Sequence, residues 1–170
     1  MPLRITATCV LSAFVLTMLG CTSVGRLELE RRTGGNAALF EQFRAYDGHT
    51  GKPISFAAAA SECATADVVF FGEEHGDAVC NALQAQLLYE LIRANRPMTL
   101  AMEFLEADTQ ASVDAYLRGR IDESDYRKQA RQKSAYVRSH RPLIEMCRVA
   151  HVPVLAANAP RELVSAYRKS

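Results

Sequence analysis

The sequence predicts an α/β domain in which helices flank a parallel sheet. Three apolar runs, at residues 67–72, 98–104 and 152–156, have the length and the composition of buried strands. Segments with helical periodicity separate these runs, and this alternation is typical of parallel strands joined by right-handed crossovers. The chain ends inside a further helical segment, so we expect a three-stranded domain that is incomplete at its C-terminus.

The overall composition is that of a soluble globular protein. The 170 residues suit one domain with a sizeable core, and 49% of them are hydrophobic and 23% charged. Arg4 is the only charged residue among the first 20, and the rest of the chain carries equal numbers of acidic and basic side chains. Proteins that bind nucleic acid normally carry a basic excess, so we expect no nucleic-acid partner.

The amino terminus resembles an export signal. Arg4 precedes an apolar run, residues 5–19, that is too short for a membrane-spanning helix. Gly20 and Cys21 follow it in the manner of the cleavage site of bacterial lipoproteins, where the cysteine receives lipid. The alternatives are an ordinary cleaved signal and an uncleaved anchor, and each of them also exports the chain.

These features divide the chain into three parts. We predict a lipoprotein signal peptide over residues 1–20, a polar tether over 21–36 and the α/β domain over 37–170. Export implies an oxidising compartment. We still predict no disulfide between Cys63 and Cys80, because a strand between them would hold them roughly 15 Å apart. Cys147 is expected to be a buried helix residue.

The elements around the first apolar run are marked by turn and cap residues. The segment 47–53 is dense in turn residues and predicts a hairpin tip, and an Ala-rich stretch predicts a helix from Ile54 to Cys63. A periodic apolar face predicts a helix from about Asp77 to Asn95. That helix should stop there, because Pro97 disfavours helical backbone at the residue before it.

Three helices are predicted between the second and third runs. They extend from Asp108 to Gly119, from Asp122 to Lys133, and onwards from Arg141. A last helix should follow the third run, with residues 158–161 as its cap, since Pro160 is favourable at a first helical position.

Polar side chains follow each predicted strand, and the carboxyl ends of parallel strands meet at one ligand-binding edge. Glu73, Glu74 and His75 follow the first strand, Glu103 lies near the end of the second, and Asn158 and Arg161 follow the third. A carboxylate inside an apolar strand, such as Glu103, is costly unless it is paired or coordinated. A divalent metal such as Zn or Mn, bound by His75, Glu73 and Glu103, would satisfy it. An ion pair between Glu103 and Arg161 would also satisfy it.

A second cluster contains Tyr136 and His140, which would share a face if this stretch is helical. Tyrosine oxygen and histidine nitrogen both bind haem iron. The alternative is that Tyr136 is a packing residue and that His140 only begins a helix.

Several motifs together resemble the ChaN family of haem-binding lipoproteins, in the Tiki- and TraB-like superfamily. The resemblance spans about residues 43 to 168, and it rests on Tyr46-Asp47, Gly51-Lys-Pro-Ile-Ser55, Asp67-Val-Val-Phe-Phe-Gly-Glu-Glu-His75, Leu83-Gln84, Ala101-Met-Glu103-Phe, Asp114-Ala-Tyr-Leu117, Tyr136, Arg141-Pro142-Leu143 and Asn158-Ala-Pro-Arg161. The chain departs from the family pattern in having no second Gly-x-x-His motif near its carboxyl end.

The resemblance implies an outer-membrane lipoprotein that faces the periplasm and takes part in haem and iron uptake. It implies haem as the cofactor, a homodimer and an outer-membrane haem receptor as partner. We expect Tyr136 or His140 as axial ligand. Arg141 or Arg161 would pair with the haem propionates, because guanidinium forms bidentate hydrogen bonds with carboxylate. Asn158 is expected to contribute to the same haem site.

The rival hypothesis from the same superfamily is an enzyme. A metal-dependent, peptidase-like hydrolase would use His75 with Glu73 or Glu103 as metal ligands and Glu74 as general base. We expect a binding protein rather than this enzyme.

Overall fold

The computed structural model describes residues 43–169. The predicted signal peptide, the predicted tether and the predicted lipidation site Cys21 lie outside the described residues. Within the described range, no helix is long and apolar enough to cross a membrane.

The described chain begins with a small antiparallel hairpin, β1 (Ala45–Tyr46) and β2 (Pro53–Ile54). Asp47 shapes the turn, because its Oδ1 atom accepts hydrogen bonds from the backbone of His49 at 3.1 Å and of Thr50 at 2.6 Å. The Thr50 hydroxyl donates to the same atom at 2.7 Å, and its hydrogen bond has the largest effect among those that lower the pKa of Asp47. The predicted hairpin tip is therefore confirmed.

The next two helices begin at side-chain caps. In α3 (Phe56–Cys63) the Ser55 side chain accepts a hydrogen bond from the backbone of Ala58, at 3.1 Å. In α4 (Ala78–Arg93) the Asp77 carboxylate does the same for Cys80, at 2.6 Å. Both predicted helices are confirmed to within two residues at each end.

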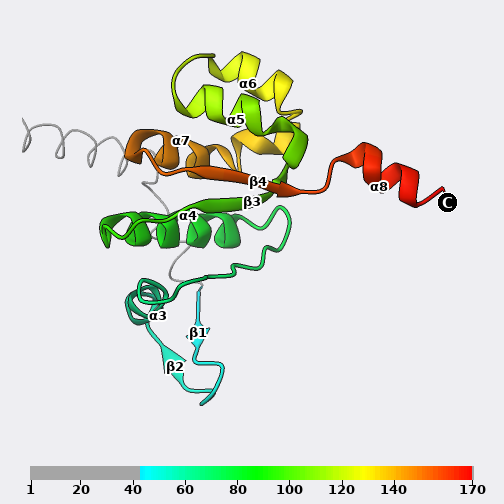
Figure 1. Cartoon of the computed structure of the whole chain (residues 1–170). Coiled ribbons are helices and arrows are strands. Elements are labelled where there is room, and N and C mark those ends of the chain that lie inside the picture. Colours follow the sequence, from blue (N-terminus) through cyan, green and yellow to red (C-terminus); the bar gives the residue numbers. More distant parts are fainter. Residues whose placement is uncertain (1–42, 170) are drawn as a thin grey trace, which may run out of the picture. The chain divides into compact units, whose positions relative to one another are not determined.

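A parallel pair of strands forms the sheet of the domain. β3 (Leu100–Glu106) and β4 (Val154–Asn158) lie side by side, with Leu100 opposite Val154 and Glu106 opposite Asn158 (Figure 1). An irregularity between Met102 and Glu106 shifts the register, so that Glu106 lies beside the end of β4. The α/β class with a parallel sheet is confirmed, and within residues 43–169 this parallel sheet has two strands.

The connection from β3 to β4 consists of helices joined by short turns (Figure 1). It contains the 3-10 turn η1 (Ala107–Thr109), α5 (Gln110–Leu117), α6 (Glu123–Gln129), the 3-10 turn η2 (Ser134–Val137) and α7 (Arg141–Ala150), and α8 (Arg161–Tyr167) follows β4. Helix α5 packs against both α6 and α7, and α4 also packs against α7.

The core lies between β3, β4 and the helices. Leu105, Val113, Ile144, Met146 and Cys147 are almost fully buried, as predicted for Cys147. The three described cysteines are free thiols. Gln110 ties α5 to the sheet, because its side chain donates to the carbonyl of Val154 at 2.9 Å and accepts from the N–H of Ala156 at 2.8 Å.

The prediction of a buried strand at 67–72 was wrong. The segment is irregular, and Phe70 is 94% exposed and Val68 67% exposed. Strand conformation requires a hydrogen-bonded neighbour, and β3 and β4 pair with each other without including this segment. Hydrogen bonds are found near its ends: Arg96 donates to the carbonyl of Ala66 at 3.5 Å, and the Cys80 thiol lies 3.8 Å from the carbonyl oxygen of Gly72.

Two helix predictions needed smaller corrections. Helix α6 ends at Gln129, short of the predicted Lys133, because Arg131 takes a left-handed conformation with φ of 52°. Helix α8 begins at Arg161, so Pro160 lies at the cap position and outside the first turn.

Candidate functional site

Glu73 lies at the centre of a cluster formed with His75, Gln84, Phe104 and His140, which we call the Glu73 cluster. One carboxylate oxygen of Glu73 lies 3.4 Å from Nδ1 of His75, and the other lies 3.6 Å from Nε2 of His140. Gln84 donates a hydrogen bond of 3.0 Å to that second oxygen. The Glu73 side chain is only 10% exposed, so its carboxylate is surrounded mainly by protein.

Local structure brings the cluster together from four parts of the chain. Gly76, with φ of +83°, reverses the backbone directly after His75, and Asp77 then begins α4. Gln84 lies in the second turn of α4. Phe104 comes from β3, and His140 occupies the cap position of α7.

The Phe104 ring lies beside both imidazoles of the cluster. Its centroid is 3.7 Å from that of His140 and 5.1 Å from that of His75. His140 is 5% exposed, whereas 68% of the His75 side chain is exposed. The two histidines therefore meet the same carboxylate, one from the interior and one from the solvent.

The surroundings of His140 disfavour its protonation. Burial lowers its pKa below the usual 6.5, His75 lowers it further, and the carboxylate of Glu73 opposes both effects. Its Nε2 atom forms no hydrogen bond with the described residues. The same nitrogen faces the carboxylate of Glu73 at 3.6 Å.

Tyr136 lies in a different environment, a buried group of tyrosines. Its ring is 1% exposed, meets Tyr126 edge-on at 5.8 Å and lies under the guanidinium of Arg127 at 5.7 Å. Tyr126 in turn stacks on Tyr116 at 4.6 Å. The Tyr136 hydroxyl has no hydrogen-bond partner among the described residues, and burial raises its pKa.

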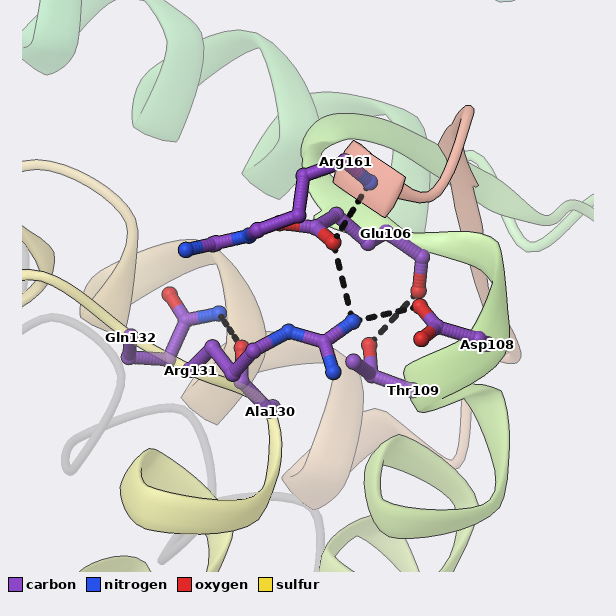
Figure 2. Close-up of polar contacts among 7 residues, drawn as sticks. All are labelled: Glu106, Asp108, Thr109, Ala130, Arg131, Gln132 and Arg161. Atoms are coloured by element: carbon purple, nitrogen blue, oxygen red, sulfur yellow. Dashed lines mark hydrogen bonds and ion pairs between the residues drawn. The ribbon is translucent and has the colours of Figure 1, made fainter. Parts of the chain in front are cut away.

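A second polar network forms where β3 and β4 end. Glu106 accepts from Nε and Nη2 of Arg161 at 2.8 and 2.6 Å and from Arg131 at 2.9 Å, and Arg131 also bonds Asp108 (Figure 2). These bonds, those of Arg161 above all, lower the pKa of Glu106 to about 2. The alternative ion pair between Glu103 and Arg161 was wrong, because Arg161 binds Glu106.

The other predicted site residues lie apart from one another. Arg141 forms two hydrogen bonds with Glu123, at 2.7 and 2.8 Å. Glu74, Glu103 and Asn158 are exposed. The expectation that Glu103 is buried was wrong, because its position on β3 faces solvent. In residues 43–169 no three side chains of His, Cys, Asp or Glu are grouped so as to hold a metal ion. Metal binding by His75, Glu73 and Glu103 stays a prediction.

Sequence reasoning identified Glu73, His75 and His140 as candidate site residues but missed the roles of Gln84 and Phe104 in this cluster. Gln84 and Phe104 lie within motifs that the resemblance used, yet neither was assigned a role. His140 was considered only together with Tyr136. A polar Gln84 beside the apolar Leu83 and Leu87, both buried, was the available signal that this side chain meets a buried polar group.

The fold and the site define an α/β domain with a histidine–carboxylate cluster beside a parallel sheet. Residues 59–170 match the family described as "Haem-binding uptake, Tiki superfamily, ChaN", and the chain belongs to this family. The suspected resemblance is thereby confirmed. No match was found among curated proteins or among solved structures.

Proposed function

We propose that this chain is a haem-binding lipoprotein of haem and iron uptake, exported and anchored through Cys21 to the periplasmic side of the outer membrane. The observation that carries the proposal is membership of a family whose description is haem-binding uptake. The apolar run that follows Arg4 supports export, and Gly20-Cys21 supports lipidation.

The residues present suit haem in their chemistry. Imidazole and phenolate are both ligands of haem iron, and the Nε2 atom of His140 and the hydroxyl of Tyr136 lack hydrogen-bond partners among the described residues. Haem also needs apolar contact for the faces of its ring. Val68, Phe70 and Phe71 are exposed in one segment, and Phe104 is partly exposed beside His75.

Arginines are the proposed partners of the haem propionates. Arg161 and Arg141 each bind one carboxylate, yet 59% and 36% of their side chains stay exposed. Guanidinium has five donors and can bind a second carboxylate. Asn158 ends β4 two residues before Pro160 and would add an amide donor close to Arg161.

When bound, haem would supply the iron that the protein carries. The chain would supply a nitrogen or oxygen donor, apolar contact and positive charge for the propionates. We further propose that the protein forms a homodimer and exchanges haem with an outer-membrane receptor, as the family resemblance implies.

Titration of the purified soluble chain, residues 22–170, with haemin tests the proposal. We expect the Soret band of haemin to shift and to saturate at a fixed ratio of haem to protein. An unchanged Soret band would overturn the proposal. Sedimentation with and without haemin tests the dimer, and mass spectrometry of the exported wild type and of a Cys21→Ser variant tests lipidation.

One observation favours the rival hydrolase, namely the 3.4 Å contact between His75 and Glu73. Carboxylate and imidazole together suit a divalent metal, with Glu103 as third ligand and Glu74 as base. Metal analysis of the wild type and of His75→Ala separates the two functions. Metal that co-purifies with the wild type and is lost in the variant would favour the hydrolase.

A further inference from the structure

We propose that helix α8 (Arg161–Tyr167), together with the two basic residues that follow it, binds the surface of an anionic lipid bilayer. The inference goes beyond the proposed function, because it gives the folded chain a membrane contact of its own, separate from the lipid proposed at Cys21.

The first argument is the exposure of α8. Among the α-helices in the described part of the chain, α8 is the one that contains no buried residue. Figure 1 shows α8 beyond the end of β4 and apart from the other labelled helices. Leu163 is 65% exposed and Tyr167 is 83% exposed. Neighbouring apolar side chains with this exposure are available to a partner that removes them from water.

The second argument is the arrangement of these side chains. Leu163 and Tyr167 are four residues apart, so they lie on the same face of the helix. Val164, which is partly exposed, lies three residues before Tyr167 and widens this face. We call Leu163, Val164 and Tyr167 the α8 stripe. An apolar stripe on an otherwise polar helix is typical of helices that lie on a membrane surface, and tyrosine is enriched at that depth.

The third argument is charge. Arg168 and Lys169 directly follow Tyr167, and both are exposed. Within residues 161–169 Glu162 is the only acidic residue, and the charge of Arg161 is balanced by Glu106. The segment therefore presents a positive excess at one end of the α8 stripe. Basic side chains beside an apolar stripe are complementary to lipid headgroups that carry negative charge.

The fourth argument is that α8 is already oriented. The backbone N–H of Arg161 donates to Glu106 at 3.1 Å, and its guanidinium donates at 2.8 and 2.6 Å (Figure 2). The first residue of α8 is therefore fixed to the end of β3. A surface that is ordered before binding loses less conformational entropy when it binds.

The fifth argument is the size of the surface. A stable protein interface buries about 800 Å² on each partner, and the three side chains of the α8 stripe are too few for that. A small contact is effective when another group already holds the chain at the same surface, because the second contact is then intramolecular. A bilayer that holds a lipid at Cys21 meets this condition, and a soluble protein partner does not.

The test uses the fact that the chain has no tryptophan. In Tyr167→Trp the new indole is the only one, and it keeps an aromatic ring with a polar group. The exported, purified protein is mixed with vesicles of phosphatidylcholine and phosphatidylglycerol in equal parts, whose acyl chains carry bromine. Because bromine quenches tryptophan at close range, we expect the emission to shift to the blue and to be quenched. Vesicles of phosphatidylcholine alone should quench it less.

Tyr46→Trp is the matched control. Tyr46 is 61% exposed, and it lies closer than Tyr167 to Cys21 along the chain. A lipid at Cys21 that merely held the chain near the vesicle would quench Tyr46→Trp at least as strongly as Tyr167→Trp. We therefore expect little quenching in Tyr46→Trp.

Three further substitutions in the Tyr167→Trp background separate apolar contact from charge. Leu163→Ser should abolish most of the quenching. Arg168→Gln and Lys169→Gln should each weaken the contact with the anionic vesicles about 5-fold, with little effect on vesicles of phosphatidylcholine alone. All three positions are exposed, and far-UV circular dichroism verifies that the variants stay folded.

The outcomes are distinct from those of the proposed function. Equal quenching of Tyr167→Trp and Tyr46→Trp would overturn the inference, and so would quenching that is independent of Leu163 and of phosphatidylglycerol. A blue shift that appears without vesicles and grows with protein concentration would mean that α8 binds a second copy, and it would also overturn the inference. A chain that binds haemin and carries lipid, but leaves Tyr167→Trp unquenched, would contradict this inference alone.

Discussion

Arg161 binds the carboxylate of Glu106 with three donors, namely its backbone N–H at 3.1 Å and two guanidinium nitrogens at 2.8 and 2.6 Å (Figure 2). Helix α8 contains no buried residue. The contact with Glu106 therefore does much to hold the start of α8 against the end of β3.

This contact predicts a pH-dependent stability that Glu106→Gln abolishes. The pKa of Glu106 falls from 4.5 to about 2 in the folded chain. Because the folded pKa is depressed, the stabilisation is present above pH 4.5 and is lost as the pH falls towards 2. Urea unfolding at pH 6 should show a loss of about 1–2 kcal/mol in the variant, and the difference should shrink at pH 3.

Glu103→Gln is the control, because Glu103 is an exposed carboxylate on the same strand. Its unfolding free energy should stay close to that of the wild type at both pH values. Equal pH profiles for wild type and Glu106→Gln would contradict the prediction.

The burial of His140 predicts that the free energy of unfolding also depends on pH in a second range, above that of Glu106. Its folded pKa lies below 6.5, so the unfolded chain takes up the proton first. The stabilisation is therefore complete above pH 6.5 and is lost as the pH falls through the folded pKa. Titration of the His140 ring protons by NMR measures that pKa directly. A midpoint above 6.5 would contradict the prediction.

Gln110→Ala should destabilise the sheet. The Gln110 side chain satisfies both a carbonyl and an N–H of β4. Removing it leaves part-buried backbone groups unpaired, which costs about 1–3 kcal/mol. Ser112→Ala on the same helix is the control, since it removes one exposed hydrogen bond to Gln129. Similar unfolding midpoints in urea for the two variants would contradict this role of Gln110.

Phe70→Ser should leave stability almost unchanged, although Phe70 belongs to the most apolar run outside the amino-terminal segment. Its side chain is 94% exposed, so we expect a change within about 0.5 kcal/mol. Ile144→Ala, at a site that is 1% exposed, should cost about 2–5 kcal/mol. Thermal melts of the two variants measure the contrast, and a large loss in Phe70→Ser would mean that the segment packs as a strand.

The Phe70 segment also shows where sequence reasoning failed. Its Val and Phe residues favour strand conformation, but a strand forms only where a neighbouring strand can pair with it. The same reasoning succeeded at 98–104 and 152–156, because those two runs lie next to each other. The position of Glu103 was misjudged for a related reason, since the face of β3 that meets solvent depends on what covers the sheet.

The sequence by itself determined the local structure and the family. Ser55, Asp77 and the Asp47 turn act on backbone groups a few residues away, so their effect can be inferred without a fold. Only the tertiary structure decided that Arg161 binds Glu106, and that Glu73 lies between His75 and His140. Arg161 and Glu106, and likewise Glu73 and His140, are distant along the chain, and the path of the backbone selects one partner among several of the same charge.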